Sequence, residues 1–309
     1  MSEQPQPDVL IVGTGALACL FAARLAAVGI PVTMLGTWRE GLAALRMYGV
    51  TLVQPDGRQQ SYPIKVVDQT DSCTPVQTAL VLVKSWQTER AAGQLAACLT
   101  PDGTALTLQN GLGNAETLSA RLGAMRVAQG VTTTGATLLS SGRVRPGGEG
   151  VVSLGEHPHL SPLTEMLRTA GFQLEVLEDV QSLVWGKLAV NAAINPLTAL
   201  LKMSNGGIIS RPSARKLAAE LALEVAAVAK AQGIMLPHTD PVAVSEEVAE
   251  KTSSNHSSMY QDILRGAPTE IDAICGAVVR AGEQVGVPTP ANRIVGQLIH
   301  ALVEGNITQ

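Results

Sequence analysis

The stretch Asp8-Val9-Leu10-Ile11-Val12-Gly13-Thr14-Gly15-Ala16-Leu17-Ala18, close to the N-terminus, decides the fold. Residues 8–12 form a mostly apolar run that ends in glycine, which is typical of a buried parallel strand. Residues 16–28 then predict a helix that ends at Gly29. A strand, a glycine turn and a helix in this order indicate the start of a doubly wound α/β sheet.

The glycine turn has the pattern GxGxxA, a variant of the dinucleotide-binding fingerprint. Gly13 permits the tight turn, and Gly15 lets a pyrophosphate approach the backbone at the helix N-terminus. Ala18 stands where a third glycine is usual, and alanine is an allowed substitute. The pattern alone also occurs in ordinary tight turns, but the flanking strand and helix favour a dinucleotide. The predicted cofactor-binding residues here are Gly13, Thr14, Gly15, Ala16, Leu17 and Ala18.

The end of the second predicted strand, residues 31–35, indicates which dinucleotide binds. NAD sites carry Asp or Glu here for the ribose 2′-hydroxyl. The sequence has Gly36-Thr37-Trp38-Arg39 instead, and no carboxylate appears before Glu40. Arg39 is suited to pair with a 2′-phosphate, which favours NADP(H). The alternative is that Arg39 is only a solvated loop residue.

Strand and helix signals alternate up to about residue 178, which predicts a parallel sheet covered by helices. After residue 178 the strand signals stop. We therefore expect an NADP-binding α/β domain over residues 1–178 and an all-helical substrate-binding domain over residues 179–309, with a ligand in the cleft between them. Further strands are expected at 79–83, 104–108, 127–133 and 151–154, a hairpin at 50–67, and helices at 114–122, 180–201, 212–233, 240–266, 268–286 and 290–304.

Composition excludes several classes of protein. A net charge of −4 and 3% aromatic residues argue against nucleic-acid binding through a basic face or base stacking. The sequence contains no run of about 18 uncharged apolar residues, so no membrane span is expected. Its 4 cysteines lie far apart without zinc-binding spacing, so no metal site is expected. Residues 1–7 are polar and proline-rich, which predicts a short disordered lead rather than a signal peptide, and hence a cytoplasmic protein.

A polar stripe runs along the apolar segment 180–201. Lys187, Asn191 and Asn195 are spaced i, i+4, i+8, so they share one face of the predicted helix. One lysine and two amides on a helix otherwise fit for burial suggest the wall of a polar cavity. A lysine there would be partly desolvated, which lowers its pKa and makes it a candidate proton donor. The alternative is a narrow stripe that faces solvent.

A second polar segment, Pro268-Thr269-Glu270-Ile271-Asp272, opens the helix expected over 268–286. Glu270 falls in its first turn, where the helix dipole stabilises a carboxylate. The dipole also gives Glu270 a plain structural explanation, so the residues alone leave its role open.

At these residues the chain resembles the ketopantoate reductases (2-dehydropantoate 2-reductases), over almost its whole length after Gln6. The motifs of the second half are the most specific, because many dehydrogenases share the glycine turn. The resemblance implies a Rossmann-like domain followed by a helical domain like the C-terminal domain of 6-phosphogluconate dehydrogenases. It rests on six separated motifs in the same order: GTGALA from Gly13, VKSWQT around Lys84, QNGLGN around Asn110, WGKLAVNAAINPLTAL around Lys187, NHSSMYQDI around Ser258 and PTEIDAICG around Glu270.

The resemblance also implies residue roles. Lys187 matches the family's general acid, which protonates the C2 carbonyl oxygen while the nicotinamide delivers hydride to C2. Glu270 matches a catalytic-site glutamate that orients the bound groups, cofactor included. Lys84, Asn110 and Ala136 match cofactor contacts, the first two at the nicotinamide end. The substrate-binding positions are Asn110, Lys187, Asn191, Asn195, Asn205, Asn255 and Ser258, with Ser258 the expected carboxylate partner.

The activity implied by the resemblance is reduction of ketopantoate to (R)-pantoate by NADPH, a step towards pantothenate and coenzyme A. One alternative is a reductase of the same family for a different 2-oxo acid. Another is a regulator that binds NADP(H) without turnover; the polar stripe argues against it, because a sensor needs no proton donor. Apolar faces of the helical half would allow a homodimer, but the sequence does not decide between a monomer and a homodimer.

Overall fold

The computed structural model describes residues 8–307, which divide into two compact units. The first unit contains the chain up to Gln109 and from Asn114 to Val180, and the second contains Asn110–Gly113 and the chain from Gln181 onward. Each unit has its own buried apolar core. The lead predicted at residues 1–7 lies outside the described residues. None of the described helices is both long and apolar enough to cross a membrane.

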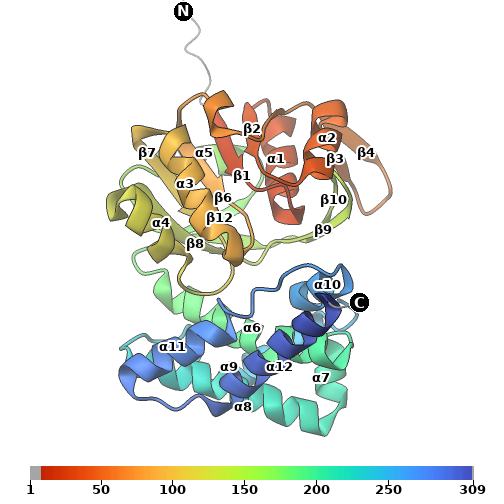
Figure 1. Ribbon diagram of the computed structural model, residues 1–309, viewed down its shortest axis with the longest axis vertical. Helices are drawn as coiled ribbons and strands as arrows, with labels where there is room; N and C mark the ends of the chain where they lie inside the picture. Colours follow the sequence, from red (N-terminus) through yellow and green to blue (C-terminus); the bar gives the residue numbers. More distant parts are fainter. Residues whose placement is uncertain (1–7, 308–309) are drawn as a thin grey trace, which may run out of the picture. The chain divides into compact units, whose positions relative to one another are not determined.

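The first unit is built on an eight-stranded sheet with the order β12-β11-β8-β7-β6-β1-β2-β5 (Figure 1). Neighbouring strands are parallel except β11 and β8, so the predicted α/β class is confirmed. All four residues of β1 are buried, as its apolar run predicts. The strands are β1 Val9–Val12, β2 Val32–Leu35, β5 Lys65–Val67, β6 Val76–Val81, β7 Leu99–Thr107, β8 Val127–Thr132, β11 Val151–Gly155 and β12 Gln173–Leu177.

Helices follow the strands in this unit. α1 begins directly after the glycine turn and buries Ala18 completely against the core, which explains why a small residue is needed there. Phe21 of the same helix stacks on Phe172, with 4.2 Å between the ring centroids. The helical segments are α1 Ala16–Ala27, α2 Arg39–Tyr48, η1 Thr70–Ser72, η2 Ser85–Gln87, α3 Thr88–Cys98, α4 Asn114–Leu122, η3 Ala124–Arg126 and α5 Ser161–Thr169.

A second, four-stranded sheet in the first unit was not predicted. Its order is β4-β3-β10-β9. The hairpin expected at 50–67 supplies β3 Val50–Val53 and β4 Gln59–Tyr62, which pair antiparallel. The other two strands are β9 Gly135–Ser140 and β10 Arg143–Gly148. Pro146, Gly147 and Gly148 weaken the strand signal of β10, because neither proline nor glycine favours an extended, hydrogen-bonded strand.

The second unit is all-helical, as predicted. Its central helix is α6, which packs against α7, α8, α9, α10 and α12. Residues carried by α6 are therefore surrounded by most of the unit. The helices are α6 Gln181–Leu201, α7 Gly206–Ser210, α8 Pro212–Ala231, α9 Pro241–Lys251, α10 Ser258–Leu264, α11 Cys275–Val285 and α12 Pro290–Ile307 (Figure 1).

Two predicted helices differ from the structure. The helix expected over 240–266 is split into α9 and α10, because the carbonyls of Ser253 and Asn255 accept tertiary hydrogen bonds from the backbone amides of Gly206 and Asn205. The helix expected over 268–286 begins only at Cys275. Glu270 therefore lies in the turn before α11, and its predicted place in the first turn of a helix was wrong.

Candidate active site

The glycine turn lies at the carboxyl ends of three central strands. Gly13 has φ +132°, and a Cβ there would lie 2.9 Å from the carbonyl oxygen of Leu82, just beyond β6. Its amide donates to the carbonyl of Leu35 at the end of β2, at 2.8 Å. Gly15 is exposed, and a Cβ on it would point into open space. No side chain caps α1 and no acidic residue occupies its first turn, so its first amides suit an anion.

The segment that carries Arg39 lies beside this turn. A Cβ on Gly36 would lie 2.7 Å from the Thr14 side chain, so the end of β2 packs directly on the glycine turn. The Trp38 ring folds back over Gly41 of α2. Arg39 is the first residue of α2 and is exposed. Arg39 thus lies three residues beyond Gly36, which packs on the glycine turn, and its contact with a cofactor phosphate stays a prediction.

The other two residues predicted to contact the cofactor in this unit lie on different sheets. Lys84 is half-buried just beyond β6, immediately before η2. Ala136 lies in β9 of the second sheet and packs half-buried against the core that contains α1. Their contact with a cofactor stays a prediction.

The polar stripe of α6 is half-buried to buried, as a cavity wall would be. Lys187 and Asn191 are half-buried, and Asn195 is 7% exposed. Burial lowers the pKa of the Lys187 ammonium to about 8, and the Glu270 carboxylate partly opposes this by raising it. The expected fall in the lysine pKa is thus confirmed, and the charged group that acts on it is the carboxylate of Glu270.

Glu270 interacts with residues of two other motifs, Lys187 and Asn110. Its side chain is 4% exposed, and its Oε2 accepts a hydrogen bond of 3.3 Å from Nδ2 of Asn110. The segment around Asn110 is held by backbone contacts to the same turn: the amide of Leu112 donates to the carbonyl of Ala273 at 2.9 Å. Gly111 has φ +82°, and a Cβ there would lie 2.3 Å from that carbonyl oxygen. Glycine at 111 thus permits the close approach that brings Asn110 to Glu270.

The remaining predicted substrate residues cluster between α6 and the break before α10. Asn205 is buried, donates from Nδ2 to Oγ1 of Thr252 at 2.8 Å, and binds the Asn255 carbonyl through its own amide. The side chain of Asn255 is exposed. Ser258 is half-buried at the start of α10. These contacts give Asn205 a structural task in shaping the break, and its contact with substrate stays a prediction.

Two residues that sequence reasoning missed hold Ser258 in place. Ser257 caps α10 by accepting from the amide of Tyr260 at 3.1 Å. Thr198 of α6, which is fully buried, donates to Oγ of Ser257 at 2.7 Å. The Ser257 hydroxyl is therefore used in hydrogen bonds to Thr198 and Tyr260, and these bonds fix the position of the neighbouring Ser258. The serine next to a helix start was a usable signal for Ser257, whereas the contact with Thr198 spans 59 positions and leaves no local pattern.

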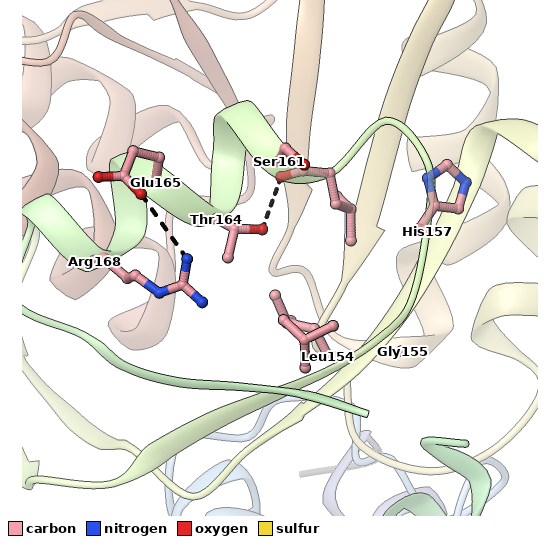
Figure 2. Close-up of a pocket in the computed structure, with 9 residues that line it drawn as sticks. Leu154, Gly155, His157, Ser161, Thr164, Glu165 and Arg168 are labelled. Carbon is pink, nitrogen blue, oxygen red and sulfur yellow. Dashed lines mark hydrogen bonds and ion pairs between the residues drawn. The ribbon is translucent and has the colours of Figure 1, made fainter. Parts of the chain in front are cut away.

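A surface cavity of about 240 Å³ lies in the first unit, away from all the residues above. Figure 2 shows His157, Ser161, Thr164 and Arg168 around it. Arg168 pairs loosely with Glu165 at 3.9 Å on the same helix, α5. The described residues contain no group of three His, Cys, Asp or Glu side chains placed to hold a metal ion.

Comparisons with known proteins match this geometry over both units. A family model described as "Ketopantoate reductase PanE/ApbA" matches residues 9–159, and one described as "Ketopantoate reductase PanE/ApbA C terminal" matches residues 179–303. A 2-dehydropantoate 2-reductase of Halobacterium salinarum is 33% identical over 94% of this chain and 97% of that protein. One of Archaeoglobus fulgidus is 34% identical over 96% of this chain and 98% of that protein.

Solved structures share the fold. A PanE/ApbA family ketopantoate reductase from Ralstonia eutropha has a TM-score of 0.90 at 28% identity, covering 97% of this chain and 99% of that one. D-mandelate dehydrogenase, solved with NADH and anilino(oxo)acetate, has a TM-score of 0.92 at 25% identity, with the same coverage. Similar folds in this group thus belong to proteins named for different substrates, ketopantoate in one case and D-mandelate in the other.

Proposed function

The chain belongs to the ketopantoate reductase family, and from that premise we propose that it reduces ketopantoate to (R)-pantoate with NADPH. One observation carries the proposal: Lys187, a half-buried lysine of lowered pKa, shares a face of α6 with two amides and interacts electrostatically with the buried Glu270. A 2-oxo acid brings a carbonyl oxygen that needs a proton and a carboxylate that needs polar partners. The polar stripe of α6 supplies both, a proton from Lys187 and polar partners from Asn191 and Asn195.

Lys187 acts as the proton donor to the C2 carbonyl oxygen. A pKa of about 8 keeps the ammonium protonated at neutral pH and makes it a stronger acid than an ordinary lysine. The Glu270 carboxylate holds this charged form in place, because its attraction favours the ammonium. Asn110, fixed to Glu270, orients the carboxylate. Asn191, Asn195 and Ser258 bind the polar groups of the substrate.

The glycine turn fits a dinucleotide on the evidence of its own geometry. The open space beside the Gly15 backbone and the uncapped amides of α1 suit a pyrophosphate. Arg39 binds the 2′-phosphate that distinguishes NADP from NAD. When bound, the reduced nicotinamide supplies the hydride for C2. The protein contributes the position of the substrate, the proton and the exclusion of competing reactions.

The substrate has one serious competitor, because D-mandelate dehydrogenase shares this fold. Both family models and the relatives at 33% and 34% identity favour ketopantoate. The test is a parallel assay of NADPH oxidation with ketopantoate and with phenylglyoxylate, the 2-oxo acid that corresponds to mandelate. We expect faster turnover of ketopantoate. Faster turnover of phenylglyoxylate would assign the chain to the other substrate, and cofactor binding without any turnover would favour a sensor.

A further inference from the structure

The Thr88 hydroxyl contacts both ends of the segment that carries Asn110. The chain leaves the first unit after Gln109 and returns to it at Asn114, and the four residues between belong to the second unit. Nε2 of Gln109 donates to Oγ1 of Thr88 at 2.8 Å. The Thr88 hydroxyl has one proton, which it shares between two acceptors that each lie 2.8 Å from Oγ1: Oδ1 of Asn114 and the carbonyl oxygen of Ser85. One hydroxyl at the start of α3 therefore bridges Gln109 and Asn114, the residues that flank the segment 110–113 on its two sides.

Burial strengthens the hydrogen bonds that Thr88 makes with Gln109 and Asn114. Thr88 is 3% exposed and Asn114 is 4% exposed, so water cannot easily replace either partner. Gln109 is anchored on two further sides: Nε2 also donates to the Val83 carbonyl at 3.1 Å, and Oε1 accepts from the Thr107 hydroxyl at 2.9 Å. Both amide protons and the amide oxygen of Gln109 are thus used. Val83 directly precedes Lys84 and Gln109 directly precedes Asn110, so the same network bounds both motif residues.

Residues 110–113 contact the turn that carries Glu270. Asn110 donates to Glu270, and the Leu112 amide donates to Ala273. Neither contact tolerates a large shift, because Gly111 already lies in tight contact with the Ala273 carbonyl. A change in how the ends of the segment are held would therefore move the Asn110 amide relative to the carboxylate that faces Lys187.

We propose that Thr88 is a positioning residue for the reaction: its hydroxyl, with the Gln109 amide, clasps the ends of residues 110–113 and so holds Asn110 against Glu270. The kinetic part of this inference rests on the proposed function. The structural part does not, because it concerns the mobility of the segment alone.

Hydrogen exchange tests the structural part without any substrate. Thr88→Val keeps the shape of the side chain and removes the hydroxyl, whereas Thr88→Ser retains it. We expect Thr88→Val to raise the exchange rate of the Leu112 amide about tenfold, as for loss of a buried hydrogen bond, and Thr88→Ser to raise it much less. The matched control is Thr164→Val. Thr164 is also a buried threonine early in a helix, where its hydroxyl donates to the Leu160 carbonyl at 2.8 Å (Figure 2).

The control separates positioning from general destabilisation. If Thr88→Val and Thr164→Val lower the melting temperature alike but only Thr88→Val speeds exchange at Leu112, the clasp is supported. If exchange at Leu112 is unchanged in Thr88→Val, or rises equally in Thr164→Val, the clasp is wrong. This result is obtained whether or not the chain reduces ketopantoate.

A double-mutant cycle tests the kinetic part. We expect Thr88→Val to lower kcat about tenfold with a smaller change in the KM for NADPH, and Thr88→Ser to restore most of the rate. In an Asn110→Ala background the same Thr88→Val change should have almost no further effect, because the group that it positions is gone. Full additivity of the two substitutions would contradict the role of Thr88 through Asn110. A wild-type chain without turnover would refute the proposed function and leave the exchange result standing.

Discussion

Asn110 donates a hydrogen bond of 3.3 Å to Glu270, across 160 positions of sequence, and the Glu270 carboxylate in turn raises the pKa of the Lys187 ammonium by electrostatic attraction. Three residues from three separate motifs thus form one cluster around a buried carboxylate. In the proposed mechanism the lysine supplies the proton, the glutamate favours the charged form of the lysine, and the asparagine orients the glutamate.

Removal of the Lys187 amine should abolish most of the turnover. We expect Lys187→Ala to lower kcat by roughly 10² or more, the scale of a lost general acid. The matched control is Lys230→Ala, which removes an exposed lysine near the end of α8 in the same unit and should leave kcat unchanged. Steady-state kinetics with melting curves for both variants checks this. An unchanged kcat in a folded Lys187→Ala variant would remove Lys187 from the mechanism.

The proposed role of Lys187 as proton donor predicts how the rate depends on pH. The donor is active when protonated, and its pKa is lowered from 10.5 to about 8, so kcat should be level below about pH 8 and fall above it. The Glu270 carboxylate raises this pKa, so in Glu270→Gln the fall should begin at a lower pH. A pH–rate profile of wild type and Glu270→Gln measures both. A fall that starts only near pH 10.5, or a shift to higher pH in Glu270→Gln, would contradict the assignment.

Much of the first unit could be predicted because its signals are local. The apolar run 8–12, the glycine turn and the helix after it occupy adjacent residues, so each can be recognised from its own short stretch of sequence. β9 and β10 were not predicted, although they are neighbours in sequence and pair with each other; β10 also pairs with β3, far away in sequence, and this second contact leaves no local pattern. The break between α9 and α10 escaped it because tertiary hydrogen bonds from the amides of Asn205 and Gly206 overrule the helical pattern.

The two glycines of the glycine turn, Gly13 and Gly15, should respond differently to an added methyl group. Gly15→Ala should leave the melting temperature unchanged, because Gly15 has an ordinary φ of −80° and open space beside it. It should weaken NADPH binding about tenfold or more, since the methyl group would occupy the pyrophosphate position. Gly13→Ala should destabilise the fold by roughly 1–3 kcal/mol, because of its φ of +132° and the nearby Leu82 carbonyl.

Thermal unfolding and a binding titration of NADPH on the two variants separate these effects. Equal destabilisation by both substitutions would show that Gly15 has only a structural task. Undiminished NADPH affinity in Gly15→Ala would place the pyrophosphate elsewhere.

Arg39 should decide between the two nicotinamide cofactors. We expect Arg39→Ala to raise the KM for NADPH about tenfold and to leave the KM for NADH nearly unchanged, because only NADPH carries the 2′-phosphate. Arg46→Ala on the same helix is the control; Arg46 pairs with Asp68 at 2.7 Å and should affect neither cofactor. An equal change in both KM values, or none, would show that Arg39 is a solvated residue without a phosphate partner.

The candidate site itself was only partly readable from the sequence. Helical spacing was enough to place Lys187, Asn191 and Asn195 on one face, because α6 is one continuous helix. No spacing rule connects Asn110 to Glu270 or Thr198 to Ser257, because both contacts arise only when separate segments pack together. The motifs indicated which residues matter, and the fold shows which of them touch.

The most direct test of the proposed activity is the initial rate of NADPH oxidation by the purified chain with ketopantoate and, in parallel, with phenylglyoxylate. Proton donation by Lys187 to a ketopantoate carbonyl predicts rapid turnover with ketopantoate, at least about tenfold above phenylglyoxylate in kcat/KM, a difference of about 1.4 kcal/mol in transition-state binding. Faster reduction of phenylglyoxylate, or no reduction of ketopantoate by a chain that binds NADPH, would contradict it.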